Sequence, residues 1–308
     1  MMSKECSGIG VAQIALRVDK TAMRYPGMLV VGILAVRGAL CAAESWTPLF
    51  NGKDLEGWRT WLAKPHESVA VPSEPRDDSG HYLKPLGWDR DPLGVFTVAE
   101  IDGQAAIHVS GQIMGCLETK STYGDYHLRL QFKWGEKRWA PRAQTPRDSG
   151  LLYHVHSEPG FSSGIWPRSI EFQIQEHDCG DLYAIGLQIT VLAKLREQLP
   201  PIYDPQGEPI LFRQVKPIGN RCVRLGDFEK PCGEWNTLDL ICLGDESIHV
   251  VNGHIVMRLA KAQRIDGANP EPLKSGNILL QSEGAEVFYR NVELRPIKTI
   301  PLEYAEKS

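Results

Sequence analysis

Three polar side chains stand at every second position of one short segment, Ser169–Gln175: a carboxylate, Glu171, and two carboxamides, Gln173 and Gln175. Alternate residues of a β-strand lie on the same face, about 7 Å apart. Together they offer hydrogen-bond acceptors and donors to a ligand that is rich in hydroxyl groups. A solvated sheet face is the simpler alternative, but such faces more often carry Lys, Thr and Glu. We therefore expect Glu171 to act on a bound ligand and the two glutamines to hold it.

The segment just before this one also carries groups that could transfer protons. Asp148, His154 and His156 are separated by even numbers of residues, so a regular strand would place them on one side. Imidazole has an unperturbed pKa of about 6.5 and serves as a general base near neutral pH. The alternative for a single histidine is a packed, hydrogen-bonded strand residue. Two such strands in succession favour a functional interpretation, in which His154 or Glu171 is the base.

A third polar cluster follows, with Glu176, His177, Asp178, Cys179 and Asp181 in close succession. Carboxylates suit Ca²⁺ and imidazole suits Zn²⁺, so a divalent cation is one interpretation of this cluster. Its spacing matches no established set of metal ligands, and an acidic turn is the favoured alternative. We therefore predict that the protein uses no metal or other cofactor.

Five cysteines lie beyond the N-terminal segment: Cys116, Cys179, Cys222, Cys232 and Cys242. None of them forms a Cys-x-x-Cys pair, so a structural zinc site is not expected. Their odd number leaves at least one free thiol, while Cys222 and Cys232 could close a short loop by a disulfide.

Alternation of apolar and polar residues with a period of two dominates the chain after Thr119. In Tyr126–Trp134 the even positions are apolar and the odd ones polar, which is typical of a strand with one face on a core. Asn252-Gly253 separates two apolar runs and predicts a tight hairpin turn. Further strands are expected at Ile107–Val109, Leu151–Val155, Thr237–Leu243, Ser247–Val251, Asn277–Gln281 and Glu286–Leu294.

One helical pattern interrupts the strands, at Ile189–Leu199, and ends before Pro200-Pro201. It lies in a stretch, 188–217, that has the character of an insertion between strands. Many short strands with turn signals and few helices predict an all-β fold, a two-sheet antiparallel sandwich with a short helical insertion. We see no low-complexity linker and no internal repeat, so residues 44–308 are expected to form a single domain.

Composition limits the functional classes. The chain has 308 residues with 29 Gly and 21 Pro, and 34 basic against 38 acidic residues give a formal net charge of −4 at pH 7. This is ordinary globular composition and excludes a collagen-like or disordered protein. Because there is no basic excess and no run of Lys and Arg, a nucleic-acid partner is not expected.

The N-terminus has the pattern of a secretory signal. Met28–Val36 is the only strong apolar run, and it is far too short to span a bilayer. Arg24 precedes this run and Cys41-Ala42-Ala43 follows it, as is typical of a signal peptide and its cleavage site. We expect residues 1–43 to form a signal region with translation starting at Met23, no membrane span, and a secreted or periplasmic protein.

Motifs spread over nearly the whole remaining chain resemble, in the same order, those of the 3-keto-disaccharide (3-keto-glucoside) hydrolase family. The resemblance implies an all-β, concanavalin A-like jelly roll related in architecture to lectins and glucanases, and a secreted bacterial protein. The motifs are Trp46-Thr47-Pro48-Leu49-Phe50-Asn51-Gly52-Lys53-Asp54-Leu55-Glu56-Gly57-Trp58, Tyr123-Gly124-Asp125-Tyr126, Asp148-Ser149-Gly150, Glu171-Phe172-Gln173-Ile174-Gln175, Gly233-Glu234-Trp235-Asn236-Thr237, Asn252-Gly253, Ile278-Leu279-Leu280-Gln281 and Tyr289-Arg290-Asn291-Val292.

The activity that the resemblance implies is elimination from an oxidised glycoside, followed by hydration. A ketone at C3, made by a separate sugar dehydrogenase, acidifies the C2 proton, so the site needs a base, an acid for the leaving group, and donors for the enolate. His154, which stands where the family usually has Arg, or Glu171 would be the base. Candidate acids or positioning groups are Asp148, Glu176 and Asp181, and candidate substrate-binding residues are Gln173, Gln175, Tyr153, Trp166 and Trp139.

Two other functions fit the same residues. Retaining glucanases with this kind of fold use Glu-x-Asp-x-x-Glu, and Glu171-x-Gln173-x-x-Glu176 differs from that pattern by one Gln. Glutamine can neither carry the charge nor relay the proton, which counts against a glucanase. A non-catalytic carbohydrate-binding module would use the same polar face and aromatic side chains without a base, and the fold alone does not separate these functions.

Overall fold

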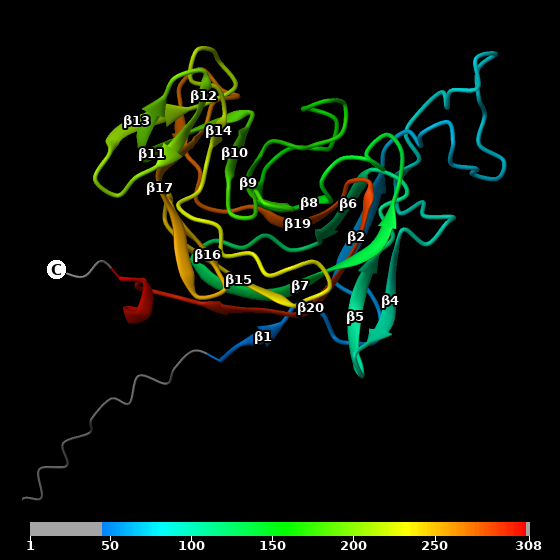
Figure 1. Cartoon of the computed structure of the whole chain (residues 1–308), viewed down its shortest axis with the longest axis horizontal. Helices are drawn as coiled ribbons and strands as arrows, with labels where there is room; N and C mark the ends of the chain where they lie inside the picture. The colour runs from blue at the N-terminus through cyan, green and yellow to red at the C-terminus, as the bar shows by residue number, and fades with distance from the viewer. Residues whose placement is uncertain (1–44, 306–308) are drawn as a thin grey trace, which may run out of the picture. The chain divides into compact units, whose positions relative to one another are not determined.

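The computed structural model describes residues 45–305, which are built almost entirely of β-strands. The strands form two antiparallel sheets that pack face to face, so the predicted all-β sandwich is confirmed (Figure 1). The helical element in this part of the chain is one 3₁₀ turn, η1 (Leu302–Tyr304). No helix within residues 45–305 is long and apolar enough to cross a membrane. The predicted signal region, 1–43, lies outside the described residues.

Sheet A is the larger sheet. Its main path runs β12-β11-β17-β16-β15-β7-β20-β5-β4, while β1 pairs with β20, β13 with β11, and β18 with β17. Its strands are β1 (Thr47–Pro48), β4 (Phe96–Ile101), β5 (Gln104–Val109), β7 (Tyr126–Arg138), β11 (Leu187–Arg196), β12 (Leu199–Tyr203), β13 (Glu208–Phe212), β15 (Asn236–Leu243), β16 (Glu246–Val251), β17 (His254–Arg264), β18 (Glu271–Pro272) and β20 (Ala285–Pro296).

Sheet B has the order β14-β10-β9-β8-β19-β6-β2-β3. Its central strands, β8 and β9, carry most of the candidate catalytic and substrate-binding residues. The strands are β2 (Trp58–Leu62), β3 (Gly87–Trp88), β6 (Gly115–Thr119), β8 (Asp148–Val155), β9 (Ser169–Gln175), β10 (Leu182–Ile185), β14 (Arg221–Cys222) and β19 (Asn277–Ser282).

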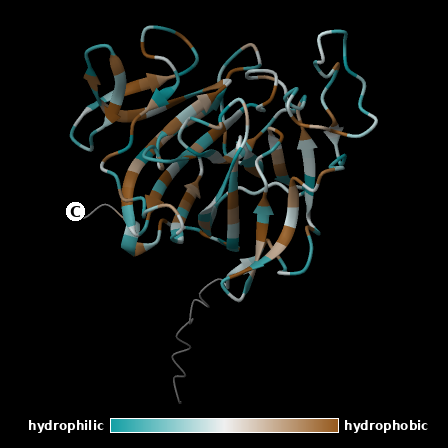
Figure 2. Ribbon diagram, turned by 45° about the vertical axis from the view of Figure 1, so that its right-hand side comes forward, coloured by the Kyte–Doolittle hydropathy of each residue, from teal (hydrophilic) through white to brown (hydrophobic). Residues whose placement is uncertain are grey.

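The main core fills the space between the sheets. On β7, Leu128, Leu130 and Phe132 are buried and alternate with polar residues, as the period-two pattern predicts. They belong to one apolar cluster with Leu151 and Phe172 of sheet B. Figure 2 shows the same alternation of hydrophobic and hydrophilic positions along the strands. One face of each sheet is therefore committed to the core, and chemistry must use the other.

The outer face of sheet B, meaning the side turned away from the main core, carries a second, smaller apolar cluster. Trp61, Leu152, Trp166 and Leu279 belong to it. Polar residues share this face with the cluster, because directly opposed partners in an antiparallel sheet point to the same side. Cross-strand register gives one continuous row of partners, Arg59, Glu118, Leu279, Leu152, Glu171, Tyr183 and Arg221, from β2 to β14.

The helix expected at Ile189–Leu199 is wrong: the segment forms most of β11 and the start of β12. Ile189, Val191 and Ala193 are buried at alternate positions, whereas Leu192 and Leu195 are 41% and 62% exposed. Leu192 and Leu195 are therefore solvent-facing residues of a strand. The stretch 188–217 instead forms β11, β12 and β13 at one end of sheet A (Figure 1).

Two local predictions concern turns and thiols. The Asn252-Gly253 hairpin is confirmed between β16 and β17, and both residues have positive φ, 49° and 83°. That conformation suits this residue pair. The disulfide considered for Cys222 and Cys232 does not form, since both are free thiols, the first buried and the second exposed. All the other cysteines in residues 45–305 are also free and buried.

Candidate active site

Glu171 lies in the middle of β9 and faces the outer side of sheet B. Its neighbours across the strands are Leu152 on β8 and Tyr183 on β10. The flanking residues Ile170 and Phe172 point into the main core, which fixes the orientation of Glu171 by alternation. Only 6% of Glu171 is exposed, so its carboxyl group is largely removed from bulk water.

Gly150 leaves the space that this carboxyl group occupies. A Cβ atom at position 150 would lie 2.7 Å from Oε1 of Glu171 and 2.4 Å from Oε1 of Gln281. Any larger residue would push one of these side chains away. Gln281, on β19, is fully buried, and neither atom of its carboxamide has a hydrogen-bond partner of normal geometry. A buried carboxamide without partners, beside a buried carboxyl group, is available to a ligand.

Two more carboxyl groups surround Glu171. Asp148, at the start of β8, and Glu283, in the turn after β19, share the guanidinium group of Arg142. Arg142 contacts Asp148 closely and lies 3.6 Å from Glu283, and it also donates a hydrogen bond of 2.9 Å to Gln175. One cation therefore serves two carboxyl groups, Asp148 and Glu283, and no ion pair of the described residues reaches Glu171.

The electrostatics of this group favour protonated carboxyls. Burial and, to a lesser extent, the charge of Asp148 together raise the pKa of Glu171 to about 8, against a smaller opposing effect of Gln281. Burial and the charge of Glu283 also raise the pKa of Asp148, although Arg142 acts in the opposite direction. Burial raises the pKa of Glu283 as well, and the charge of Glu171 adds to this. Each carboxyl group therefore makes ionisation of the others more costly.

The two glutamines of β9 complete the same side of the sheet. Gln173 is buried opposite Gly150, and its carboxamide oxygen accepts a hydrogen bond from the backbone N–H of Ile174. Gln175 lies opposite Asp148 and donates a 2.8 Å hydrogen bond to Asp178. The row of Glu171, Gln173 and Gln175 is thus brought together on one face, as the alternation predicts.

His154 does not lie on this face, because β8 contains a bulge. Leu152 pairs with Leu279 and Val155 with Asn277, so β8 has one more residue than β19 between these two pairs. His154 occupies the irregular position with φ of 49°. A bulge reverses the side on which later residues emerge. The expectation that Asp148, His154 and His156 share one side assumed a regular strand, and the bulge overturns it.

The imidazole of His154 packs in the interior instead. Its ring centre lies 5.3 Å from that of Tyr153 and 6.2 Å from that of Tyr126, both of which belong to the main core. Neither ring nitrogen has a hydrogen-bond partner, and burial, together with the charge of His156, lowers the pKa of His154 to about 4. His154 and Glu171 therefore do not converge, and of the two candidate bases only Glu171 faces the outer side of sheet B.

We expect His154→Asn to retain activity but to lose a pH-dependent part of the stability. Asn tolerates the positive φ at this position. Because the folded pKa of about 4 lies below the unfolded value, the stability held above pH 6.5 is lost as the pH falls. Between pH 7 and pH 5 the free energy of unfolding should fall by about 2 kcal/mol more in the unmodified protein than in the variant. Urea titrations at the two pH values measure this, and equal losses would contradict it.

Tyr153 is also interior rather than substrate-facing. Its hydroxyl group is hydrogen-bonded to Ser247 at 2.7 Å and to His249 at 3.0 Å, which joins sheet B to β16 of sheet A. His156 lies just beyond β8 and is half-buried, and its Nδ1 is 3.0 Å from the backbone oxygen of His154. Neither residue reaches Glu171 in any contact of the described chain.

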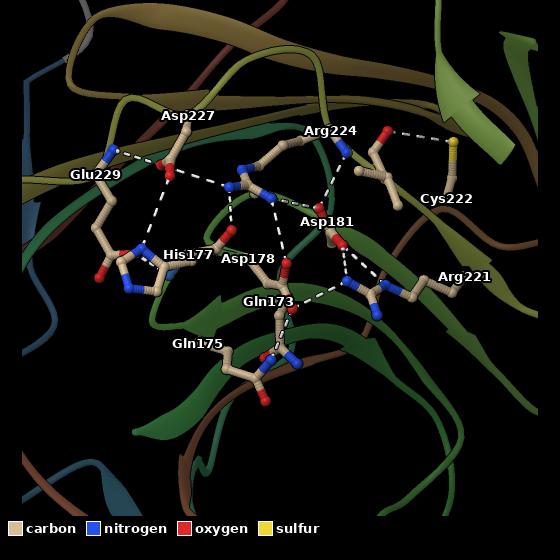
Figure 3. A network of polar contacts seen from close by, with 12 residues as sticks. Gln173, Gln175, His177, Asp178, Asp181, Arg221, Cys222, Arg224, Asp227 and Glu229 are labelled. Atoms are coloured by element: carbon tan, nitrogen blue, oxygen red, sulfur yellow. Dashed lines mark hydrogen bonds and ion pairs between the residues drawn. The ribbon is translucent and has the colours of Figure 1, made fainter. Parts of the chain in front are cut away.

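Asp181 and Glu176 are held by arginines rather than left free for a substrate (Figure 3). Asp181 is fully buried and lies 2.7 Å from Arg221 and 3.2 Å from Arg224. Glu176, which Figure 3 does not label, lies 2.6 Å from Arg147 and accepts a hydrogen bond from its backbone N–H. Burial opposes it, but these bonds lower the pKa of Glu176. The acidic segment is thus a structural turn.

The predicted tryptophans both lie beside the site. Trp166 is 9% exposed and packs in the apolar cluster of the outer face. Trp139 is half-buried, and its indole N–H donates a 2.9 Å hydrogen bond to the backbone oxygen of Ser110. The backbone N–H of Trp139 donates to Gly284, the residue after Glu283. Trp139 therefore lies next to the turn that supplies the third carboxyl group.

Arg142, Gln281 and Glu283 are the site residues that sequence reasoning missed. Gln281 ends a predicted strand two residues after Leu279, so the two side chains were expected to share one face of the sheet. Arg142 and Glu283 lie in connections, and nothing in their spacing shows that these connections meet. Within residues 45–305, no group of three or more His, Cys, Asp and Glu residues is arranged to hold a metal ion.

A large hollow of about 1070 Å³ lies elsewhere, on sheet A beside η1. Its walls include Leu192, Ile248, Arg258 and Ile300, and none of the residues predicted to act on a substrate lines it. Volume alone would select this hollow, whereas the carboxyl groups with raised pKa lie on sheet B. We assign the candidate site to sheet B, because perturbed titratable groups mark functional sites more directly than volume does.

The sequence of residues 45–295 matches the family model described as the 3-keto-alpha-glucoside-1,2-lyase-like domain. The chain belongs to this family. The match covers all the strands of the lyase-like domain except the last residue of β20, and it includes every residue of the candidate site. Membership assigns the domain to carbohydrate chemistry and confirms the resemblance seen in the motifs. A search of curated proteins finds no match.

Comparison with solved structures finds similar chains at low sequence identity. Two structures described as candidate glycosyl hydrolases from Parabacteroides distasonis ATCC 8503 have 19% and 20% identity and TM-scores of 0.45 and 0.44. Each covers 82% of this chain, and 94% and 100% of the other chain. The carbohydrate-binding module CBM66 from Bacillus subtilis has 9% identity and a TM-score of 0.39, over 65% of this chain and 91% of that chain.

Proposed function

We propose that the protein cleaves 3-keto-glycosides by elimination, with the sugar bound over the outer face of sheet B and Glu171 as the base. The observation that supports this most is a buried carboxyl group with a pKa of about 8, next to two further carboxyl groups and one arginine. Acids and bases are most effective in catalysis when their pKa is close to the working pH. Family membership makes a 3-keto-sugar the first substrate to test.

The reaction needs one proton removed and one supplied. The ketone at C3 makes the C2 proton acidic, and Glu171 takes this proton to leave an enolate with its charge on the C3 oxygen. The electron pair of the enolate then forms the C1=C2 double bond while the C3 ketone is restored and the C1–O bond breaks. Asp148, which burial keeps protonated, gives its proton to the departing glycosidic oxygen. In the second half, water adds its hydroxyl to C1 and its proton to Asp148, and Glu171 returns its proton to C2. The product is the free 3-keto-sugar.

The remaining groups have positioning roles. The enolate carries its charge on the C3 oxygen, and the carboxamide of Gln281, which lies beside Glu171 and has no hydrogen-bond partner of normal geometry, can donate to it. Gln173, the next outward residue on β9, is the second candidate donor. Arg142 holds Asp148 and Glu283 in place.

A retaining glucanase is less well supported. It would need Glu176 as the partner of Glu171, and Glu176 is engaged by Arg147. A binding module would have no use for three carboxyl groups that oppose one another's ionisation, since gathering them costs stability.

The test compares three substrates: a 3-keto-glucoside, its unoxidised parent and a β-glucan, with sugar release followed by chromatography. We expect cleavage of the keto-glucoside alone. Cleavage of the β-glucan would overturn the proposal in favour of a glucanase, and binding without turnover of any substrate would overturn it in favour of a module. The matched control is Glu176→Gln, which should still cleave the keto-glucoside.

The setting of the reaction follows from its substrate. A separate sugar dehydrogenase must oxidise C3 before this protein can act, and we propose that the two proteins work in succession. We also propose that residues 1–43 direct the mature chain out of the cytoplasm, as the apolar run at Met28–Val36 and the small residues after it suggest.

A further inference from the structure

A second group of ligand-type residues lies on the outer face of sheet B, three strands away from Glu171. Arg59 on β2 and Glu118 on β6 form an ion pair of 2.7 Å. The guanidinium carbon of Arg59 lies 3.8 Å from the centre of the Trp88 ring, and the Trp88 indole N–H donates a 2.8 Å hydrogen bond to Glu158. Trp61 is the cross-strand partner of Trp88. We call these five residues the Arg59 cluster.

Part of this cluster is unsatisfied. Glu118 is 2% exposed, yet only one of its carboxylate oxygens has a partner, and Oε2 has none. The Nε–H group of Arg59 also lacks a partner. Buried charged groups normally use all their hydrogen-bonding capacity. The ion pair therefore contains one unused acceptor, Oε2 of Glu118, and one unused donor, the Nε–H of Arg59. Arg59 lies against the half-buried indole ring of Trp88.

These features match a sugar ring better than other ligands. A pyranose offers hydroxyl groups that donate and accept, and a C–H face that packs on an aromatic ring. Arg59 and Glu118 cancel in charge and Glu158 adds a negative charge, so the cluster does not attract a phosphate or a carboxylate. The chemistry favours a neutral carbohydrate.

The distance between Glu171 and the Arg59 cluster decides which sugar unit of a substrate the cluster could bind. Glu171, Leu152, Leu279 and Glu118 are successive partners across four neighbouring strands. Three strand spacings are about 14 Å, which is longer than one pyranose ring. The Arg59 cluster is thus too far away to hold the ring whose C2 proton Glu171 removes.

We infer that the Arg59 cluster is a binding subsite for a further sugar unit, so that the substrate is an oligosaccharide rather than a glycoside of a small alcohol. This inference rests on the proposed function for the identity of the reacting ring. Leu152 and Leu279 form the apolar floor between the two positions, with Trp166 in the same cluster.

The test uses Trp88→Ala and a matched control, Trp235→Ala. Trp235 lies on the other sheet with the same surroundings, an arginine 3.8 Å from its ring centre and a carboxylate 2.8 Å from its indole N–H. With a 3-keto-trisaccharide, Trp88→Ala should lower kcat/KM about tenfold, mainly through KM. With methyl 3-keto-glucoside the same variant should stay within about twofold of the unmodified protein, and Trp235→Ala should do so with both substrates. Equal losses on both substrates with Trp88→Ala would overturn the inference.

A second measurement keeps the inference separate from the chemistry. Calorimetric titration with unoxidised α- and β-linked glucose trisaccharides should show binding of at least one trisaccharide, weakened about tenfold by Trp88→Ala and by Glu118→Gln, but not by Trp235→Ala. If this holds while no keto-glycoside is cleaved, the proposed function fails and the subsite stands. If Trp88→Ala binds trisaccharides as the unmodified protein does, or no trisaccharide binds, the subsite is overturned.

Discussion

Glu171→Gln should lower kcat/KM for a 3-keto-glucoside by a factor of about 10² to 10⁴, because the general base is removed while the shape of the side chain is kept. The variant should fold normally, since Gln replaces a carboxyl group that burial already keeps largely protonated at neutral pH. Steady-state kinetics with purified protein measure the loss, and thermal unfolding checks the fold.

The pH dependence gives this prediction a second readout. A base with a pKa of about 8 is active only when deprotonated, so kcat/KM should rise as the pH approaches 8. It should fall again at higher pH, because the acid Asp148, whose pKa burial also raises, must stay protonated. This rising limb should be absent from whatever activity Glu171→Gln retains. A variant with unchanged activity, or with the same limb as the unmodified protein, would assign the base to another residue.

Asp181→Asn should lower the free energy of unfolding by about 3 to 5 kcal/mol, the usual cost of breaking a buried ion pair from one side. Asp181 is fully buried between Arg221 and Arg224, and the substitution leaves these two cations with one charged partner fewer (Figure 3). Asn keeps the volume of the side chain, so the loss reports on charge. Urea-induced unfolding measures it.

Asp227→Asn is the control for this network. Asp227 contacts the same Arg224 at 3.4 Å, but its side chain is 47% exposed, and exposed pairs contribute about 1 kcal/mol or less. The comparison also separates two roles for Asp181. If Asp181 is instead an acid or a positioning group, as the family resemblance suggested, Asp181→Asn would lower activity without a comparable loss of stability.

Most of the fold was predictable from the sequence, because alternation records burial directly. The segments Tyr126–Trp134 and Ser169–Gln175 became β7 and β9 with the expected faces inward. The method failed at Ile189–Leu199, where Leu192 and Leu195 are exposed. Assignment of secondary structure from the spacing of apolar residues assumes that each of these residues is buried. These leucines, at one end of sheet A, are exposed.

The candidate site was predictable only along single strands. Glu171 and its two glutamines follow from one alternating segment, whereas the bulge that turns His154 inward depends on pairing with β19, which no local pattern encodes. Arg142 and Glu283 reach the site from two connections that are far apart in the sequence. Their meeting is a property of the tertiary structure, so sequence spacing could not reveal it.

The free thiols have a practical consequence. Since residues 45–305 contain no cross-link, the folded state of this part of the chain does not depend on an oxidising environment, and reducing agents should leave it intact. Burial raises the pKa of Cys116 and Cys179 well above the usual value, so these thiols resist alkylation, while Cys232 is open to solvent. Among the cysteines of residues 45–305, a maleimide dye or spin probe would therefore attach at Cys232 first, which gives a reporter position in this part of the chain without an engineered cysteine.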